Sequence, residues 1–166
     1  MLFRSMMSLE EFLAWPGDGS ARYYELVDGV VRAMSPATWM HGTIQGNLAA
    51  LINLRLWETK APCSLSTEGA IVPKLRANKN LRVSDIGVTC APISSGQVTA
   101  PEPVLLIEIL SPSNEATTRE IVWMYVTIPS VREILLVHST RVKAELLRRN
   151  SDGSWPEDFI EIEEIG

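Results

Sequence analysis

Apolar residues recur at three- and four-residue steps in three parts of the chain, which is the spacing of an amphipathic α-helix. The pattern predicts a short helix over Leu9–Trp15, a long helix over His41–Trp57 and a third over Thr118–Thr127. Ser8-Leu-Glu-Glu11 has the Ser-x-x-Glu spacing of a capping box and favours a helix start at that point. We expect the long helix to pack its apolar side on a sheet.

Alternating or continuous apolar runs predict the strands. Arg22–Val27 and Val30–Met34 flank Asp28-Gly29, a dipeptide typical of a two-residue hairpin turn. Val104–Leu110 is almost continuously apolar and indicates a central strand buried on both faces. Further strands are expected over Ser64–Val72, Arg82–Cys90, Glu133–His138 and Arg141–Arg149, and from Ile160 onward.

The order of these elements predicts an α/β (α+β) fold, in which helices flank a mixed central sheet and an N-terminal helix and hairpin precede it. The length of 166 residues suits a single domain, with a core over 7–149 and a C-terminal acidic strand over 155–166. The pattern leaves the order of the strands in the sheet open.

Composition excludes several classes of protein. Apolar residues make up 46% of the chain and charged residues 21%, a globular balance that excludes disordered, collagen-like and coiled-coil proteins. The formal net charge of -5 has the wrong sign for a protein that coats nucleic acid nonspecifically, so a polyanion would need a local basic patch. No signal-peptide pattern or apolar run of membrane-spanning length is present, which predicts a soluble, cytoplasmic protein.

The cysteines also favour a cytoplasmic protein. Cys63 and Cys90 show no close spacing, and we expect neither a disulfide framework nor a zinc ribbon. A reducing cytoplasm is the compartment in which free thiols persist.

Glu108 is the most informative single residue, because a carboxylate within a continuously apolar strand needs a cation, a proton or a metal to offset its charge. Asp85 is the other acid within a β-rich run, and the intervening loop allows the two strands to be neighbours. Two such carboxylates form a hard oxygen site suited to Mg²⁺ or Mn²⁺. The alternative is a core ion pair of Glu108 with Arg82 or Arg119.

Other candidates come from the hairpin and the long helix. Glu25 lies in a hairpin arm opposite Arg32, so either a cross-strand ion pair or a role in a site is open to it. His41 and Gln45 lie one turn apart on one helix face and can point together at a ligand or phosphate, or His41 can be a simple capping residue. Glu68 is expected to be solvated and His138 to be structural.

An ordered set of motifs resembles a known family. The set consists of Met7-Ser-Leu-Glu-Glu-Phe-Leu13, Arg22-Tyr-Tyr-Glu-Leu-Val-Asp-Gly29, Met34-Ser-Pro36, His41, Val83-Ser-Asp85, Ile107-Glu-Ile-Leu-Ser-Pro-Ser113 and Ile128-Pro-Ser-Val-Arg-Glu133. In this order they resemble the Uma-two family, a bacterial family of restriction-endonuclease-like proteins in the PD-(D/E)XK nuclease superfamily. The resemblance covers Met7 to about Glu145.

The resemblance implies a metal-dependent phosphodiesterase that acts on DNA, with Mg²⁺ or Mn²⁺ as cofactor. Asp85 matches the first metal ligand and Glu108 the second, and the Ile109 backbone carbonyl is a further candidate ligand. Glu25 matches the acidic residue of the hairpin, and His41 the helix histidine near the site, with Gln45 beside it.

The sequence departs from the superfamily pattern at two positions. Ser84 replaces the proline before the aspartate, and Leu110 replaces the lysine two residues after the glutamate. The stretch where many family members carry that lysine on the following helix reads Ile121-Val122 here, and the chain has no lysine between Lys79 and Lys143. Arg119 is a candidate source of the positive charge, although a guanidinium cannot act as a base.

Two functions therefore remain open. One is a Mg²⁺-dependent endonuclease that uses Asp85 and Glu108. The other is a catalytically inactive nuclease-fold protein that acts as an interaction or dimerisation module. The resemblance also makes a homodimer possible, formed through an edge that carries Ile160, Ile162 and Ile165. The alternative is a last strand that packs on the core of its own chain.

Overall fold

The computed structural model describes residues 6–20 and 22–163. A short helix, α1 (Leu9–Ala14), is followed by the hairpin of β1 (Tyr24–Val27) and β2 (Val30–Ala33). The predicted capping box is confirmed, since Glu11 N–H donates to the Ser8 hydroxyl and Ser8 N–H donates to the Glu11 carboxylate. The hairpin has the register expected from a two-residue Asp28-Gly29 turn.

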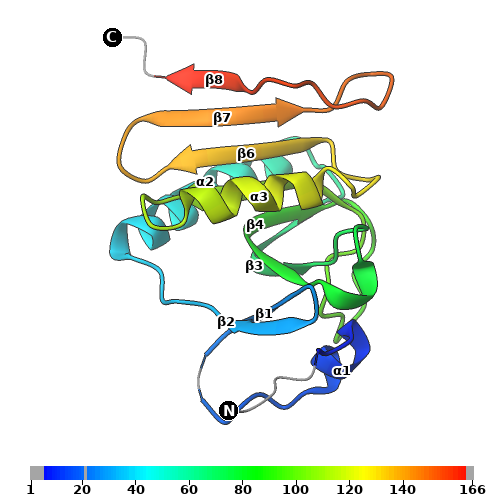
Figure 1. Ribbon diagram of the computed structural model, residues 1–166. Coiled ribbons are helices and arrows are strands. Elements are labelled where there is room, and N and C mark those ends of the chain that lie inside the picture. Colours follow the sequence, from blue (N-terminus) through cyan, green and yellow to red (C-terminus); the bar gives the residue numbers. More distant parts are fainter. Residues whose placement is uncertain (1–5, 21, 164–166) are drawn as a thin grey trace.

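Six strands form the main sheet in the order β3-β4-β5-β6-β7-β8 (Figure 1). Only the β5–β6 pair is parallel, so the sheet is mixed, as predicted. The strands are β3 (Ser64–Ile71), β4 (Arg82–Thr89), β5 (Pro103–Leu110), β6 (Glu133–His138), β7 (Lys143–Arg148) and β8 (Ile160–Glu163). A 3₁₀ turn, η1 (Ala77–Lys79), precedes β4.

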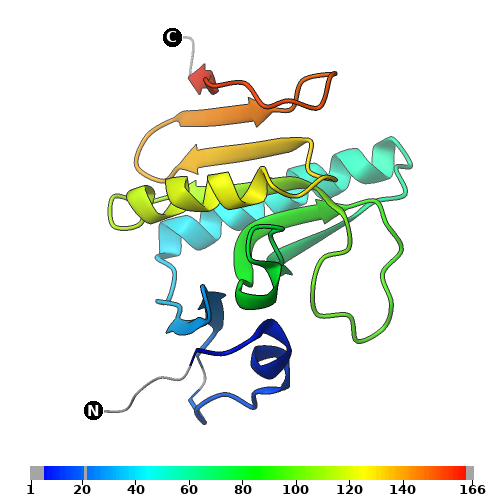
Figure 2. The same cartoon turned by 45° about the vertical axis from the view of Figure 1, so that its right-hand side comes forward.

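Two helices flank the sheet. α3 (Glu115–Tyr125) forms the crossover between the parallel strands β5 and β6, and α2 (Trp39–Glu58) lies on the other side of the sheet (Figures 1 and 2). α3 begins three residues earlier than the periodicity predicts, because Ser111 and Asn114 close the preceding loop. Among the described residues, no helix is long and apolar enough to cross a membrane.

The main core lies between α3 and the sheet. Its residues are Ile71, Leu106, Leu110, Ile121, Val122, Tyr125, Ile128, Val131, Ile134, Leu136 and Leu147. Ile107 and Ile109 alternate with these residues along β5 and are also buried, which confirms β5 as a strand covered on both faces. This double burial is what takes Glu108 out of water.

The hairpin joins the main sheet at the start of β4. Leu26 and Leu81 exchange two backbone hydrogen bonds of 2.9 Å, and the Asn80 side chain accepts from Asp28 N–H. Both leucines are buried. This junction brings β1, and with it Glu25, against the first residues of β4.

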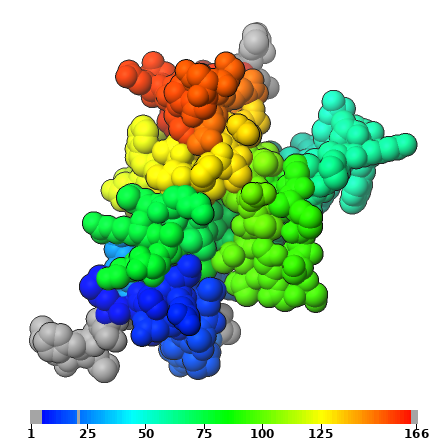
Figure 3. Space-filling model, turned by 90° about the vertical axis from the view of Figure 1, so that its right-hand side faces the viewer, coloured from blue at the N-terminus to red at the C-terminus, as the bar shows by residue number. Residues whose placement is uncertain are grey.

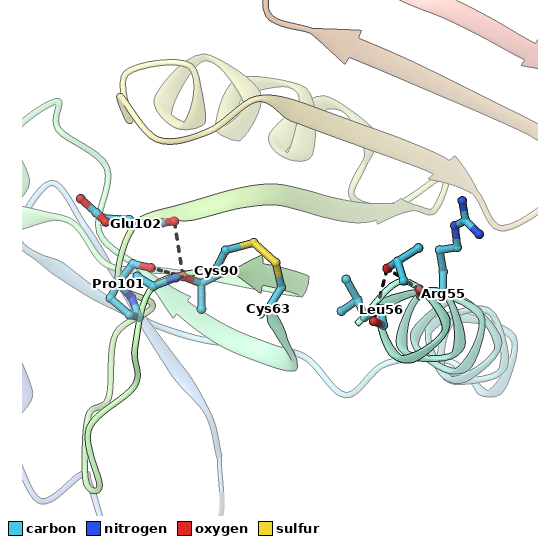
Figure 4. Close-up of a disulfide and its surroundings, with 9 residues drawn as sticks. Arg55, Leu56, Cys63, Cys90, Pro101 and Glu102 are labelled. Atoms are coloured by element: carbon cyan, nitrogen blue, oxygen red, sulfur yellow. Dashed lines mark hydrogen bonds between the residues drawn. A yellow bond between two sulfur atoms is a disulfide. The ribbon is translucent and has the colours of Figure 1, made fainter. Parts of the chain in front are cut away.

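The prediction that the cysteines are free is wrong, because Cys63 and Cys90 form a disulfide (Figure 4). Cys63 precedes β3 and Cys90 follows β4, and the antiparallel register that pairs Ser64 with Thr89 places the two cysteines opposite each other. Sequence spacing could not reveal the bridge, since the two cysteines lie 27 positions apart and only strand pairing brings them together. With no free cysteine among the described residues, the thiol argument for a reducing compartment no longer holds.

Candidate functional site

Asp85 and Glu108 lie on the neighbouring strands β4 and β5, as the sequence predicts. The hydrogen-bonded ladder between these strands ends at the pair Ile86 and Ile107, just before the two acids. The next available donor on β5, Ile109 N–H, instead donates to Asp85 Oδ2 at 2.6 Å. Asp85 is therefore held at the point where the two strands separate.

The long helix α2 holds Asp85 from a second direction. His41 Nε2 lies 2.9 Å from Asp85 Oδ1, and the Gln45 amide donates to the Asp85 backbone carbonyl at 2.7 Å. The Thr38 side chain caps the helix by accepting from His41 N–H, so the first turn that carries the histidine is well formed. His41 and Gln45, which the spacing predicts to point together at a ligand or phosphate, both contact Asp85.

The Asp85 contact changes the protonation of His41. The hydrogen bond to the Asp85 carboxylate raises the pKa of the imidazole above its ordinary value, although partial burial opposes this effect. The charge of Glu68 adds to the rise. Glu68 is exposed, as expected, but its φ of 54° is left-handed, an uncommon backbone conformation within a strand.

Glu108 is buried and carries a strongly perturbed carboxyl group. Its residue exposure is 6%, and the Tyr125 hydroxyl of α3 donates to its Oε1 at 2.7 Å. Burial raises the pKa of Glu108 well above the ordinary value, and the negative charges of Asp85 and Glu25 raise it further. The Tyr125 hydrogen bond only partly opposes these effects. The site therefore holds more negative charge than its hydrogen bonds compensate.

The alternative interpretation, a core ion pair of Glu108 with Arg82 or Arg119, is wrong. Arg82 directs Nη1 toward Glu25 Oε2 at 3.4 Å, and Arg119 binds both carboxylate oxygens of Glu145 at 2.8 and 2.9 Å. Each arginine is thus paired with a carboxylate other than Glu108.

Glu25 contacts β4 through its side chain. Its Oε1 accepts from Val83 N–H at 2.9 Å, and its other oxygen faces Arg82. The predicted register opposite Arg32 is confirmed, but the carboxylate is bonded to the neighbouring sheet. Glu25 therefore lies close enough to the acidic site for its charge to raise the pKa of Glu108.

Tyr125 is a site neighbour that sequence reasoning missed, and Arg82 was considered only as an ion-pair partner of Glu108. Arg82 is only 6% exposed, its Nε has no hydrogen-bond partner, and its Nη2 contacts the Met124 sulfur at 3.4 Å. A buried and incompletely paired guanidinium is costly unless nearby negative charge offsets it. Two features of the sequence could have indicated these neighbours. Arg82 begins a β-rich run, and Tyr125 carries a hydroxyl group among the apolar positions of α3.

Arg119 and His138 form a separate polar cluster at the end of β6. His138 Nε2 lies 2.7 Å from Glu145 Oε1, and Arg119 binds Glu115 as well as Glu145. These contacts give His138 the structural position that was expected. Arg119, the candidate source of positive charge, pairs with two carboxylates of this separate cluster.

The two positions that depart from the superfamily pattern are buried. The Ser84 hydroxyl has no hydrogen-bond partner, and Leu110 lies in the main core at 2% exposure. The Ile109 carbonyl, the third candidate ligand, accepts from the Asn114 amide at 3.4 Å. Leu110 is thus a packing residue in this protein.

The donor atoms fit a hard divalent cation. Asp85 and Glu108 present carboxylate oxygens. The pKa of Glu108 is raised first by burial and then by the charges of Asp85 and Glu25, and a cation would offset both effects. Over the described parts of the chain, no three His, Cys, Asp or Glu side chains are grouped closely enough to hold a metal ion. A cation at this position would therefore take its remaining ligands from backbone carbonyls, water or substrate, as Mg²⁺ commonly does.

Comparison with known proteins agrees with this fold. A crystal structure described as "a putative nuclease belonging to DUF820", from Anabaena variabilis, superposes with a TM-score of 0.71 at 18% identity, over 95% of this chain and 85% of that one. The uncharacterized protein slr1290 of Synechocystis is 29% identical over 168 residues, which cover 96% of this chain and 86% of that protein. Residues 9–164 match the Uma2 family, described as "Putative restriction endonuclease". Since the match spans nearly the whole sequence, the chain belongs to the Uma2 family.

Proposed function

We propose that this protein is a metal-dependent endonuclease that hydrolyses phosphodiester bonds in DNA, with Asp85 and Glu108 as the metal ligands. The observation that carries the proposal is the position of a buried Glu108 beside Asp85 where β4 and β5 separate. Membership of the Uma2 family supports the same reaction class.

The chain orients Asp85 before any ligand binds. Ile109 N–H and His41 each engage one carboxylate oxygen, and Gln45 anchors the backbone carbonyl of the same residue. A carboxylate held in this way loses little conformational freedom when it binds a cation, and each oxygen keeps a lone pair for coordination. We assign Asp85 and Glu108 as ligands and the Ile109 carbonyl as a third.

Mg²⁺ or Mn²⁺ at these ligands would lower the pKa of a water molecule and offset charge on the phosphate. The Asp85 contact raises the pKa of His41, and the protonated imidazole would stabilise a phosphate oxygen. Glu25 acts indirectly by holding Arg82 and Val83 in place. No covalent intermediate with the enzyme is needed.

Positive charge is the component that differs from the superfamily pattern. Leu110 replaces the lysine, and Arg119 is committed to Glu115 and Glu145. We assign the cationic role to His41 and Arg82. The positive charge of Arg82 lowers the pKa of Tyr125, the hydrogen-bond partner of Glu108, although burial and the Glu108 charge raise that pKa more strongly.

The second candidate function is an interaction module that retains the nuclease fold without hydrolysis. The leucine at position 110 favours it, because this side chain packs in the apolar core and supplies no ammonium group to the site. This alternative predicts that divalent cations leave the protein unchanged.

Metal titration separates the two functions without knowledge of the substrate. Metal-stripped protein is titrated with Mn²⁺ and Mg²⁺ by calorimetry, alongside Asp85→Asn, Glu108→Gln and the exposed α3 control Glu120→Gln. We expect binding by the wild type and by the control, and loss of binding in both site variants. Nicking of supercoiled DNA is then measured with the same four proteins.

The outcomes are distinct. Binding and nicking that both site variants abolish would support the nuclease, whereas nicking that survives Asp85→Asn would refute the assignment of the site. Absence of both binding and nicking at millimolar metal would favour the interaction module.

We also propose that the protein works as a homodimer. The sequence suggests β8 as the contact, and β8 is indeed an edge strand on which Ile160 and Ile162 are exposed. Ile165, the third residue of that suggestion, lies outside the described residues.

A further inference from the structure

The long helix α2 has two apolar sides but only one side covered by the sheet. The covered side carries His41, Ile44, Gln45, Leu48, Ile52 and Leu56. None of the 20 residues of the helix is buried. Apolar residues on two opposite sides of a helix are typical of a helix covered on both sides, so the outer side of α2 has the character of a covered surface.

The outer side, which we call the α2 face, has large residues at its two ends and small residues at its centre. Trp39 and Trp57 lie at its two ends, Thr43 and Leu54 come next, and small residues occupy its centre. These central residues are Gly46 and Ala50. Together the six residues follow three- and four-residue steps, and a methyl group built on Gly46 would meet nothing within 4 Å.

The α2 face is also exposed and uncharged. Trp39 is 92% exposed, Trp57 73% and Leu54 51%. From Trp39 to Leu54 the helix contains no Asp, Glu, Lys or Arg. Its C-terminal part projects from the rest of the molecule, as Figures 2 and 3 show.

The apolar area is close to what a dimer interface needs. The two indoles alone expose roughly 400 Å², if a complete tryptophan contributes about 250 Å². Met40 and Leu51 flank the α2 face and are also exposed. With Leu54 they bring the surface toward the ~800 Å² per partner that a standard interface buries.

We propose that the α2 face is the interface of the homodimer, formed when two copies of α2 pack antiparallel across a twofold axis near the middle of the helix. This inference names the contact for the homodimer proposed above and does not depend on hydrolysis. A twofold interface requires a surface that is complementary to itself. Small residues at the centre allow a close approach there, and Trp39 of one chain lies beside the partner's Trp57.

Charge favours a second copy of this chain over other partners. The uncharged centre avoids the repulsion that two chains of net charge -5 would otherwise meet. An antiparallel pair also places Glu58 near the N-terminus of the partner helix, where a negative charge is favourable. A nucleic acid would require a basic surface, which this stretch of helix lacks.

The experiment measures mass in solution by sedimentation velocity. We expect the wild type to sediment as two chains of 18.4 kDa. Ala50→Glu and Leu54→Glu should each weaken the dimer at least tenfold, because they place like charges near the twofold axis. Trp123→Glu, an exposed position on α3, should leave it intact. Circular dichroism and a thermal melt check that every variant is folded.

A cross-linking experiment tests the orientation of the helices. In a mixture of Thr43→Cys and Leu54→Cys proteins, an antiparallel pair links the two different variants, whereas a parallel pair links each variant to itself.

Three results would overturn the proposal. A wild type that is monomeric at about 100 µM, a concentration equal to the dissociation constant of a weak dimer, refutes the homodimer itself. A dimer that persists in both α2 variants, or that only Ile162→Pro on β8 disrupts, refutes the α2 interface and leaves the homodimer standing. Cross-links of Thr43→Cys to itself alone refute the antiparallel arrangement. None of these results bears on metal binding by Asp85 and Glu108.

Discussion

The Tyr125 hydroxyl donates a hydrogen bond of 2.7 Å to Glu108 Oε1, within the core between α3 and β5. Both residues are buried, and burial raises the pKa of each well above its ordinary value. The contact fixes one Glu108 oxygen and ties the crossover helix to the central strand. The acidic site and the packing of α3 are thus coupled through one hydrogen bond.

Tyr125→Phe tests this coupling. The change keeps the ring and removes the donor, so the pKa of Glu108 should rise further and the free energy of unfolding should fall by about 1–2 kcal/mol. Urea denaturation at pH 7 measures the loss. Tyr24→Phe is the matched control, since its hydroxyl meets Ser20 at the surface. Equal effects of the two changes would contradict a special role for the buried contact.

The His41–Asp85 pair predicts a shifted histidine titration. NMR should find the pKa of His41 above its ordinary value of 6.5 in the wild type, and Asp85→Asn should lower it, because the carboxylate is the main cause of the rise. The contact stabilises the folded protein below pH 6.5, and this contribution disappears as the pH rises through the pKa of folded His41. The His138 signals at pH 7 should not change, since His138 contacts Glu145. A His41 titration that is identical in both proteins would rule out the contact.

Glu145 predicts the stability of the protein in acid. Arg119 and His138 lower the pKa of this carboxyl from 4.5 to about 2. Because the folded state releases the proton more readily, the stabilisation is complete above pH 4.5 and is lost as the pH falls toward 2. The shift corresponds to about 3 kcal/mol.

Glu145→Gln should therefore flatten the fall in stability between pH 4.5 and 2, measured by urea denaturation at several pH values. Glu157→Gln, at an exposed position, should leave the slope unchanged. A slope that persists in Glu145→Gln would show that other carboxyl groups dominate acid unfolding.

The disulfide predicts a redox-dependent stability. The bridge closes a segment in which 27 positions separate the two cysteines, and a loop of that length is worth about 3 kcal/mol in the chain-entropy view. Reduction should lower the urea midpoint of the wild type and leave the Cys63→Ser/Cys90→Ser protein unchanged. Thiol titration in denaturant provides the check, since two free thiols in unreduced protein would disprove the bridge.

Local pattern explains how much of the fold was predictable. Three predicted features depend only on a few neighbouring residues, and each is confirmed. They are the capping box at Ser8, the Asp28-Gly29 turn and the apolar run of β5. Helix α3 was misplaced at its start because Asn114 closes the loop through its side chain. The disulfide was missed because it depends on the register of β3 and β4.

The candidate site divides in the same way. Asp85 and Glu108 are conspicuous in the sequence, since acids within β-rich runs are costly to bury without compensation. What each acid contacts could not be read from its neighbours. Arg82 contacts Glu25 across 57 positions of sequence, and His41 reaches Asp85 across 44.

The sequence by itself determined which segments become helices and strands and which carboxylates leave water, because periodicity and burial are properties of consecutive residues. The tertiary structure decided which charges meet. It directed Arg82 to Glu25, confined Arg119 to Glu145 and left Glu108 with Tyr125 and uncompensated negative charge. It also left one apolar side of α2 uncovered. The physical reason is that electrostatic and packing partners are chosen by distance in space, which strand order, register and helix placement set together.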